Sequence, residues 1–351
     1  MELLKNMEEK DFEQLVICHD GKSGLKAAIA IHSTARGPAL GGTRMWPYAS
    51  EEEAFNDVLR LARGMSYKNA MADLPLGGGK GVIIGDPERD KSEALFHAYG
   101  NFIDRLPGCY ITAEDVGTCP EDMDAIARGT RWVLGTTSAG GDPSPSTARG
   151  VRQGMKAALE HLFGTQDLAG RVIAVQGVGQ VGAFLCRLLA EDGAKLVISD
   201  INRTRADAIA AELEATVVSP EEITAVSCDI FAPCALGAVI NEDTLDRLKC
   251  AIVAGAANNV LKEDEYGYGL VDRGILYAPD YVVNAGGVIF LADQLESHEP
   301  DRATRRINGI YDTCKEVFKL AEKEGIPPFA AADKIAERRM ARGSSENEAA
   351  G

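Results

Sequence analysis

The stretch RVIAVQGVGQVGAFLCRLLAEDGAKLVISD, residues 171–200, decides the fold of the second half of this chain. An apolar run leads into Gly177, Gly179 and Gly182, which are spaced as G-x-G-x-x-G, and apolar residues at helical spacing follow. A second apolar run, KLVIS, ends at Asp200. The order predicted is strand, glycine turn, helix and strand, which is the βαβ unit that binds a dinucleotide.

The glycine turn predicts a site for a pyrophosphate. Glycines permit a tight turn and let phosphate approach the helix N-terminus, while a carboxylate at Asp200 accepts hydrogen bonds from ribose hydroxyls. A purely structural glycine turn is the alternative. Asp200 would repel a 2′-phosphate, so NAD is favoured over NADP as the cofactor, although Arg203 and Arg205 could soften that preference. The expected cofactor contacts are Gly177, Val178, Gly179, Gln180, Val181, Gly182 and Asp200.

Four short apolar runs follow at regular intervals, which is typical of a parallel sheet with crossovers: ATVVS, CDIFAP, AIVAG and ILYAP. The clearest linker is TTSAGGDPSPS, residues 136–146. We therefore expect an α/β protein of two domains with an active-site cleft between them. Residues 1–140 form an N-terminal substrate-binding and catalytic domain and residues 141–324 a Rossmann-type dinucleotide-binding domain, while helices from about 325–351 return to the first.

Within the first domain, FEQLVICHD and GLKAAIAIH predict two strands joined by a short turn. The glycine- and proline-rich residues 37–48 predict a loop, and Ser50 with Glu53 predicts the start of a helix. Near the C-terminus, we expect a long helix over about 302–322, another over about 330–342, and a disordered polar tail.

The window GMSYKNAMADLPLGGGKGVIIG, residues 64–85, carries Lys68 and Lys80 among small and apolar residues. Lysine is rarely buried without a reason, and three glycines before Lys80 allow backbone or ligand to approach closely. The pattern indicates cations held in a partly dry cleft. The alternative is that both lysines extend to the surface beside an ordinary turn.

Composition excludes several classes of function. Lys plus Arg number 37 against 53 Asp plus Glu, a formal charge of −16, which argues against non-specific binding to nucleic acid or anionic membranes. Eight scattered cysteines without a Cys-x-x-Cys pair, and no long apolar run or signal-peptide pattern, predict a cytoplasmic protein. The five histidines show no metal-ligand spacing, so we expect no metal. GGGK lacks the spacing of a phosphate-binding P-loop, and Cys234 has no histidine near it in sequence to activate it as a nucleophile.

Several blocks in the same order resemble the amino-acid dehydrogenases of the leucine, valine and phenylalanine type, relatives of glutamate dehydrogenase. The blocks are GPALGGTRMWPY, GMSYKNAMADLPLGGGKGVIIGDP, TAEDVGT, the glycine fingerprint, CDIFAPCALGAVI, AGAANN and YAPDYVVNAGGVI. The resemblance implies NAD-dependent oxidative deamination of an L-amino acid to its 2-oxo acid with release of ammonia, the reverse reductive amination, and a homo-oligomer.

The same resemblance implies roles for individual residues. Lys68 would hold the substrate carboxylate, Lys80 would be the catalytic lysine and Asp115 would shuttle protons. The chemistry needs such groups, because hydride loss from the amino-acid Cα leaves an iminium that water attacks with the help of a base. A second ammonium and partial desolvation favour a neutral lysine that can be this base. The other implied contacts are Gly41, Gly42, Met65 and Asn259 for substrate, and Thr147 and Asn284 for cofactor.

Resemblance also implies an aliphatic pocket for the substrate side chain, lined by Leu40, Ala113, Val288 and Leu291. Glutamate is disfavoured, because glutamate enzymes carry a lysine where Leu40 stands. The blocks lean toward leucine dehydrogenase and branched aliphatic substrates, but Phe290 and Leu291 depart from the leucine-enzyme pattern. An enzyme for aromatic amino acids and a non-catalytic NAD-binding protein are the alternatives.

Overall fold

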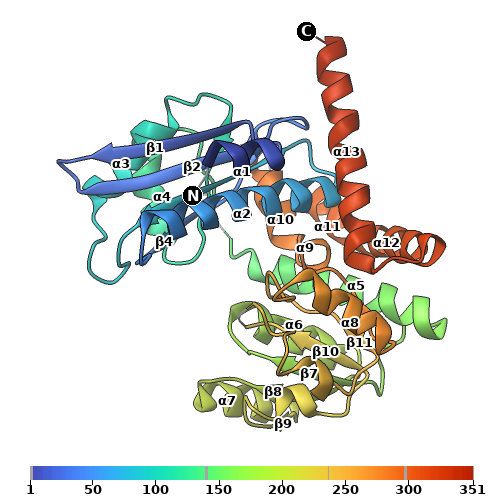
Figure 1. The fold of residues 1–351 in the computed structure, drawn as a ribbon. Helices are drawn as coiled ribbons and strands as arrows, with labels where there is room; N and C mark the ends of the chain where they lie inside the picture. Colours follow the sequence, from blue (N-terminus) through green and yellow to red (C-terminus); the bar gives the residue numbers. More distant parts are fainter. Residues whose placement is uncertain (1–2, 139–140, 236, 296–298, 351) are drawn as a thin grey trace. The chain divides into compact units, whose positions relative to one another are not determined.

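The computed structural model describes residues 3–138, 141–235, 237–295 and 299–350 (Figure 1). The chain divides into two compact units, residues 1–141 with 336–351, and residues 142–335. The second division lies within helix α13 (Pro328–Ala350). The sequence led us to place the two boundaries after residue 140 and at about residue 325.

The first unit is built on a six-stranded sheet whose centre is β5 (Gly77–Ile84). The predicted hairpin is confirmed, because β1 (Gln14–Asp20) and β2 (Leu25–Ser33) pair antiparallel, and β2 pairs antiparallel with β5. The remaining strands are β3 (Ala39–Leu40), β4 (Thr43–Trp46) and β6 (Tyr110–Ile111).

The loop predicted over residues 37–48 is wrong in part, since β3 and β4 lie within it and both pair parallel with β5. The three glycines before Lys80 are likewise part of β5 and do not form a turn. Local glycine and proline content predicts a loop, but pairing with a central strand satisfies the backbone groups and outweighs that local preference.

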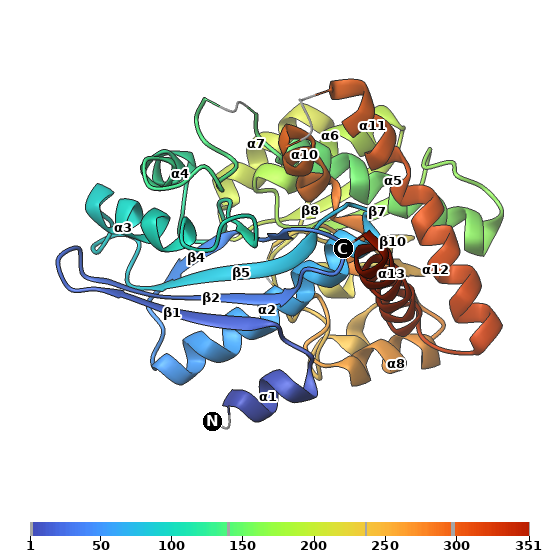
Figure 2. The same cartoon turned by 90° about the horizontal axis from the view of Figure 1, so that it is seen from above.

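Helices cover both faces of this sheet (Figure 2). One hydrophobic cluster joins it to α2 (Glu51–Met71) and α1 (Leu3–Glu9), and another joins it to α3 (Glu93–Ile103) and α4 (Pro120–Ala127). The start of α2 is as predicted, because the side chain of Ser50 accepts a hydrogen bond of 3.1 Å from the backbone N–H of Glu53.

Gly78 lets α2 pack directly on β5. A Cβ atom at Gly78 would lie 2.0 Å from the backbone nitrogen of Ser66. We expect Gly78→Ala to lower the free energy of unfolding by about 3 kcal/mol, since backbone atoms would have to separate. Gly64 lies in α2, and no atom lies within 4 Å of a Cβ there. Gly64→Ala should therefore raise the free energy of unfolding by about 0.5–1 kcal/mol. Urea unfolding at one protein concentration measures both, and equal effects would contradict the packing argument.

The second unit confirms the predicted parallel sheet, whose six strands run in the order β12-β11-β10-β7-β8-β9. The strands are β7 (Val172–Gln176), β8 (Lys195–Ser199), β9 (Thr216–Val217), β10 (Ile230–Pro233), β11 (Ile252–Val253) and β12 (Leu276–Tyr277). All its pairs are parallel. The middle residues of β7 are all buried, as expected for a parallel strand covered on both faces.

Helices precede, connect and follow these strands. They are α5 (Ser144–Phe163), α6 (Gln180–Glu191), α7 (Arg203–Leu213), α8 (Asp264–Asp272), α9 (Asp280–Val283), α10 (Gly286–Leu295), α11 (Pro300–Asn308) and α12 (Ile310–Glu324). Short 3-10 turns cover residues 223–225 and 245–247.

Three helix predictions need correction. α5 begins at Ser144, inside the predicted linker. The long helix predicted over 302–322 is two helices that meet at Gly309. The tail predicted to be disordered continues α13 to Ala350, because adding residues to an existing helix costs less than nucleating one. Among the helices described, none is long and apolar enough to cross a membrane.

Candidate functional site

Lys80 is a buried cation in the middle of β5. Its side chain is 6% exposed, and its Nζ lies 2.8 Å from Oδ2 of Asp115. A charged pair is stable in such a position only when its polar atoms are satisfied. The structure therefore brings together two of the residues that the sequence singled out, from segments far apart in the chain.

Asp115 follows β6 and is held as an anion. Burial raises the pKa of its carboxyl, but the charges of Lys80 and Arg44 outweigh burial and lower this pKa from 3.8 to about 2. Arg44 Nε donates to Asp115 Oδ2 over 3.1 Å. Asp115 is consequently ionised at neutral pH and can accept a proton or a hydrogen bond without donating one.

Sequence reasoning missed the partners of Asp115 beyond Lys80. Arg44 Nη1 also donates to Oδ2 of Asp57 over 3.0 Å, and the hydroxyl of Tyr48 donates to the same oxygen over 2.7 Å. One signal was available, because Asp57 stands three residues after Ala54 on the apolar stripe of α2. A carboxylate at such a position needs a buried partner.

Two of the implied substrate residues of the first unit, Gly41 and Gly42, approach other implied site residues. A Cβ at Gly41 would lie 3.1 Å from Met65 Cγ, and one at Gly42 would lie 3.1 Å from Asp115 Cβ. Lys68, three residues after Met65 on α2, is half-buried. Spacing of three residues places both on one face of the helix.

Leu40 and Ala113 are packed within the first unit, at 1% and 2% exposure. The other two residues of the implied aliphatic pocket, Val288 and Leu291, belong to α10 of the second unit, where Val288 is buried and Leu291 half-buried. All four side chains are aliphatic or small.

The glycine turn of the second unit has the shape that a pyrophosphate requires. Gly177 has a φ of +94°, and a Cβ at Gly182 would lie 2.0 Å from the carbonyl oxygen of Gly177. Above Gly179 there is space, since the nearest atom to a Cβ there is Arg205 Nη1 at 3.9 Å. Gln180, Val181 and Gly182 form the first turn of α6. Their position gives a phosphate the positive end of the helix.

Asp200 lies at the end of β8 and is tied to the glycine turn. Its carboxylate accepts hydrogen bonds from the backbone N–H groups of Val178 (2.9 Å) and Asn202 (2.8 Å). Arg205 Nη1 lies 3.8 Å from Asp200 Oδ2. Each carboxylate oxygen has further lone pairs, so Asp200 can still accept from a ribose hydroxyl.

Asn284 carries a buried acceptor that suits a bound ligand. Its Nδ2 donates to the backbone oxygen of Ala256 (3.2 Å) and to Oδ1 of Asn258 (2.9 Å). Its Oδ1 is buried without a hydrogen-bond partner among the described residues, as is Oε1 of Gln176 just before the glycine turn. An unsatisfied buried acceptor is costly. A donor on a bound cofactor would satisfy each of them, so these residues fit a nicotinamide dinucleotide.

The other two implied residues of this unit differ in their surroundings. Thr147 lies against the start of α10, since a Cβ atom at Gly287 would lie 2.7 Å from Oγ1 of Thr147. The Thr147 hydroxyl donates a hydrogen bond of 3.1 Å to the backbone oxygen of Pro143. Asn259 is exposed with a φ of +52°, and its neighbour Asn258 makes the contact with Asn284. Asn258 is thus a residue that the sequence did not single out.

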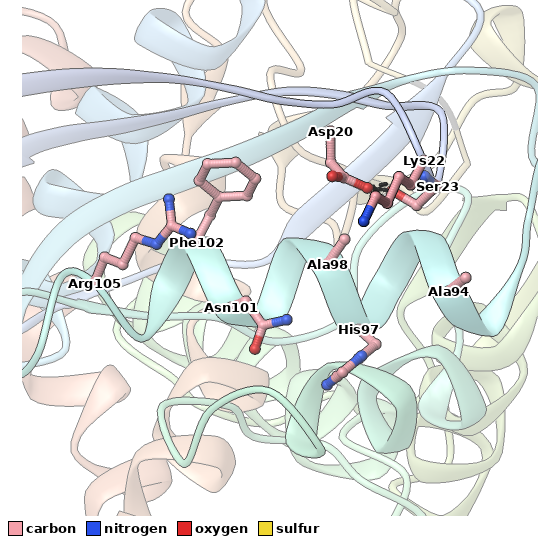
Figure 3. A pocket seen from close by; sticks show the side chains of 9 residues that line it. All are labelled: Asp20, Lys22, Ser23, Ala94, His97, Ala98, Asn101, Phe102 and Arg105. Carbon is pink, nitrogen blue, oxygen red and sulfur yellow. Dashed lines mark hydrogen bonds between the residues drawn. The ribbon is translucent and has the colours of Figure 1, made fainter.

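A separate hollow of about 330 Å³ lies beside the β1–β2 turn and α3 (Figure 3). Its charged members include Lys22, Arg105 and Asp20, but the carboxylate of Asp20 is occupied by the hydroxyl of Ser23 at 2.7 Å. None of the residues that line it is a predicted site residue.

Known proteins resemble this chain over nearly its whole length. A model of the Glu/Leu/Phe/Val dehydrogenase dimerisation domain matches residues 12–132, and one of glutamate/leucine/phenylalanine/valine dehydrogenase matches residues 142–204 and 198–346. A leucine dehydrogenase of Thermoactinomyces intermedius is 57% identical over 97% of this chain and 94% of its own length. A valine dehydrogenase of Streptomyces coelicolor is 53% identical over 94% and 92%.

Among solved structures, an L-tryptophan dehydrogenase from Nostoc punctiforme aligns with a TM-score of 0.86 and 42% identity, covering 97% of this chain and 99% of that one. These matches confirm both the two-domain α/β fold and the resemblance seen in the sequence motifs. The chain belongs to the glutamate/leucine/phenylalanine/valine dehydrogenase family.

Proposed function

We propose that this protein catalyses the NAD-dependent oxidative deamination of L-leucine and other branched-chain L-amino acids, together with the reverse reductive amination. It is an oxidoreductase of the amino-acid dehydrogenase class, because residues 12–132 and 142–346 match models of that family. The observation that carries the proposal is the buried Lys80–Asp115 pair, bordered by Gly42 and Arg44. Buried charged pairs with a shifted pKa, as at Asp115, are concentrated at functional sites.

Each charged residue has a task in this reaction. Lys68 binds the substrate carboxylate. Asp115, ionised because its pKa is about 2, accepts a hydrogen bond or a proton from the substrate amino group. Lys80, which is a cation in its pair with Asp115, must first lose a proton, and it then takes a proton from the water that attacks the substrate Cα. Bound NAD supplies the acceptor for the hydride that leaves this carbon.

The cofactor is a nicotinamide dinucleotide, and we propose NAD over NADP. Gly177, Gly179 and Gly182 would hold the pyrophosphate and Asp200 the ribose, with Thr147 and Asn284 toward the nicotinamide. Support comes from the charge of Asp200, whose carboxylate is oriented by Val178 and Asn202. A 2′-phosphate would meet that negative charge.

Asp200→Asn tests the cofactor preference. Asparagine removes the negative charge that would repel a 2′-phosphate, while Arg205 stays nearby. The ratio of kcat/KM with NADP to kcat/KM with NAD should therefore rise by about 10-fold or more, because about 1.4 kcal/mol of charge interaction corresponds to a tenfold change in rate. Initial rates with both cofactors measure the ratio. Glu212→Gln, which removes the exposed partner of Arg187, is the control and should leave the ratio unchanged. An unchanged ratio in Asp200→Asn would exclude this role.

The preference for branched aliphatic substrates rests on the aliphatic character of Leu40, Ala113, Val288 and Leu291. Relatives called leucine and valine dehydrogenase support it. The related solved structure is called an L-tryptophan dehydrogenase, so an aromatic substrate is the second candidate. Spectrophotometric NADH formation with each common L-amino acid decides. Highest kcat/KM for phenylalanine or tryptophan would overturn the leucine assignment, and no NADH with any amino acid would overturn the activity.

We further propose a homo-oligomer in the cytoplasm. The match of residues 12–132 to a dimerisation domain supports the first point. The free thiols of the eight cysteines suit a reducing compartment, which supports the second. Small-molecule substrate, 2-oxo acid and ammonia are the expected partners, with neither nucleic acid nor membrane.

A further inference from the structure

Two cysteines outside the proposed site face each other in the second unit. Cys228 and Cys250 come just before the parallel strands β10 and β11. Ser227 and Lys249 form a parallel β-bridge, and the difference between their residue numbers equals that between paired residues of β10 and β11. Cys228 is therefore directly opposite Cys250. In a parallel pair, opposite residues point to the same face of the sheet.

Their surroundings leave both thiols available. Each is half-buried and packs at the edge of the same hydrophobic cluster. The Cys228 thiol donates a hydrogen bond to Cys250. This bond and the charge of Arg273 lower the pKa of Cys250, although burial acts in the opposite direction. The same hydrogen bond and burial both raise the pKa of Cys228. Arg273 is held there because its Nη2 donates to the backbone oxygen of Leu248 over 2.9 Å. A thiol beside a donor and a cation is the more reactive of a pair.

We propose that Cys228 and Cys250 form a reversible dithiol–disulfide pair that is oxidised by hydroperoxides. The Cys250 thiolate attacks one peroxide oxygen, the O–O bond breaks, and an alcohol, or water from hydrogen peroxide, leaves. The Cys228 sulfur then attacks the sulfenic sulfur of Cys250, the S–O bond breaks and water leaves as the disulfide forms. Two electrons pass from the two sulfurs to the peroxide. A small dithiol returns both thiols by exchange.

The other cysteines lack this combination. Burial raises the pKa of Cys186 above its usual range and that of Cys234 to about 12, so these thiols remain protonated. Cys109 is exposed and provides the matched control for a thiol that solvent reaches freely. Cys250 is therefore expected to be oxidised before the buried cysteines Cys186 and Cys234.

Disulfide formation would close the segment between Cys228 and Cys250. That segment contributes Ile240 and Leu248 to the hydrophobic core of the second unit. Closing it restricts the unfolded chain, so oxidation is expected to raise the Tm by about 5 °C.

The test is peroxide treatment of the full-length folded protein, followed by alkylation of free thiols, digestion and mass spectrometry. Trypsin cleaves after Arg247 and Lys249, so the disulfide joins two separate peptides, and chymotrypsin after Phe231 separates Cys228 from Cys234. We expect loss of two thiols, a Cys228–Cys250 link and a higher Tm, all reversed by dithiothreitol. Both thiols remaining alkylatable, or a link to Cys234 instead, would overturn the proposal.

Variants identify the attacking sulfur. Cys228→Ala should leave a sulfenic acid on Cys250 that dimedone labels, whereas Cys250→Ala should leave Cys228 unoxidised at the same peroxide dose. Cys109→Ala should keep the Cys228–Cys250 link and the Tm increase. Loss of the link in Cys109→Ala, or dimedone labelling of Cys228 in Cys250→Ala, would contradict the assigned roles. Circular dichroism checks that each variant is folded.

Discussion

Lys80→Ala is expected to lower kcat for L-leucine by about 10²–10⁴-fold, which is the usual loss when a positioned general base is removed. The proposed base is lost, while Asp115 keeps its bond to Arg44, so no unpaired carboxylate is left in the interior. The fold and the binding of NADH should therefore survive. Steady-state kinetics measure kcat, NADH fluorescence titration measures cofactor binding, and circular dichroism measures folding.

Lys26→Ala is the matched control, because Lys26 is an exposed lysine on the adjacent strand β2. Its kcat should equal that of the unmodified protein. A Lys80→Ala protein that is folded, binds NADH and turns over at a near-normal rate would remove Lys80 from the chemistry.

Asp115→Asn is expected to lower kcat by about 10²–10⁴-fold and also to destabilise the protein. The folded-state pKa of Asp115 is about 2, below the usual value of 3.8 for an aspartate. A lowered pKa means that the ionised carboxylate stabilises the fold. The difference between the two pKa values corresponds to a stabilisation of about 2 kcal/mol at neutral pH. Asparagine keeps the shape of the side chain but leaves Lys80 without its counter-charge.

The pH dependence of this destabilisation has a definite sign. Stabilisation by Asp115 is fully present above pH 3.8 and is lost as the pH falls through 2. The stability gap between wild type and Asp115→Asn should thus be constant from about pH 7 to 5 and shrink below 4. Urea unfolding across this range measures it. Asp73→Asn, which removes an exposed carboxylate that pairs with Arg36, should cost less than about 1 kcal/mol and keep full activity. A gap that widens toward low pH would refute the ion-pair account.

Sequence alone predicted the parts of the fold that follow from local physics. The glycine turn at residues 177–182 could be predicted because a tight turn and the close approach of a phosphate both require glycine at fixed positions. β7, α6 and β8 lie around it as predicted. The β1–β2 hairpin and the cap at Ser50 are local in the same way. Lys80 and Asp115 could be named because their motifs resemble a known family, which their spacing alone would not have shown.

Tertiary structure decided whatever depends on residues far apart in the chain. The glycines before Lys80 are a strand because β2 and β3 pair with them, and Gly78 is required because Ser66 of α2 approaches its backbone. Arg44 and Asp57 complete the charge network around Asp115 only after folding. The pairing of Cys228 with Cys250 likewise follows from the β10–β11 register. Strand pairing, burial and charge interactions act through space, so a local pattern can show that a residue such as Asp57 needs a partner but cannot identify that partner.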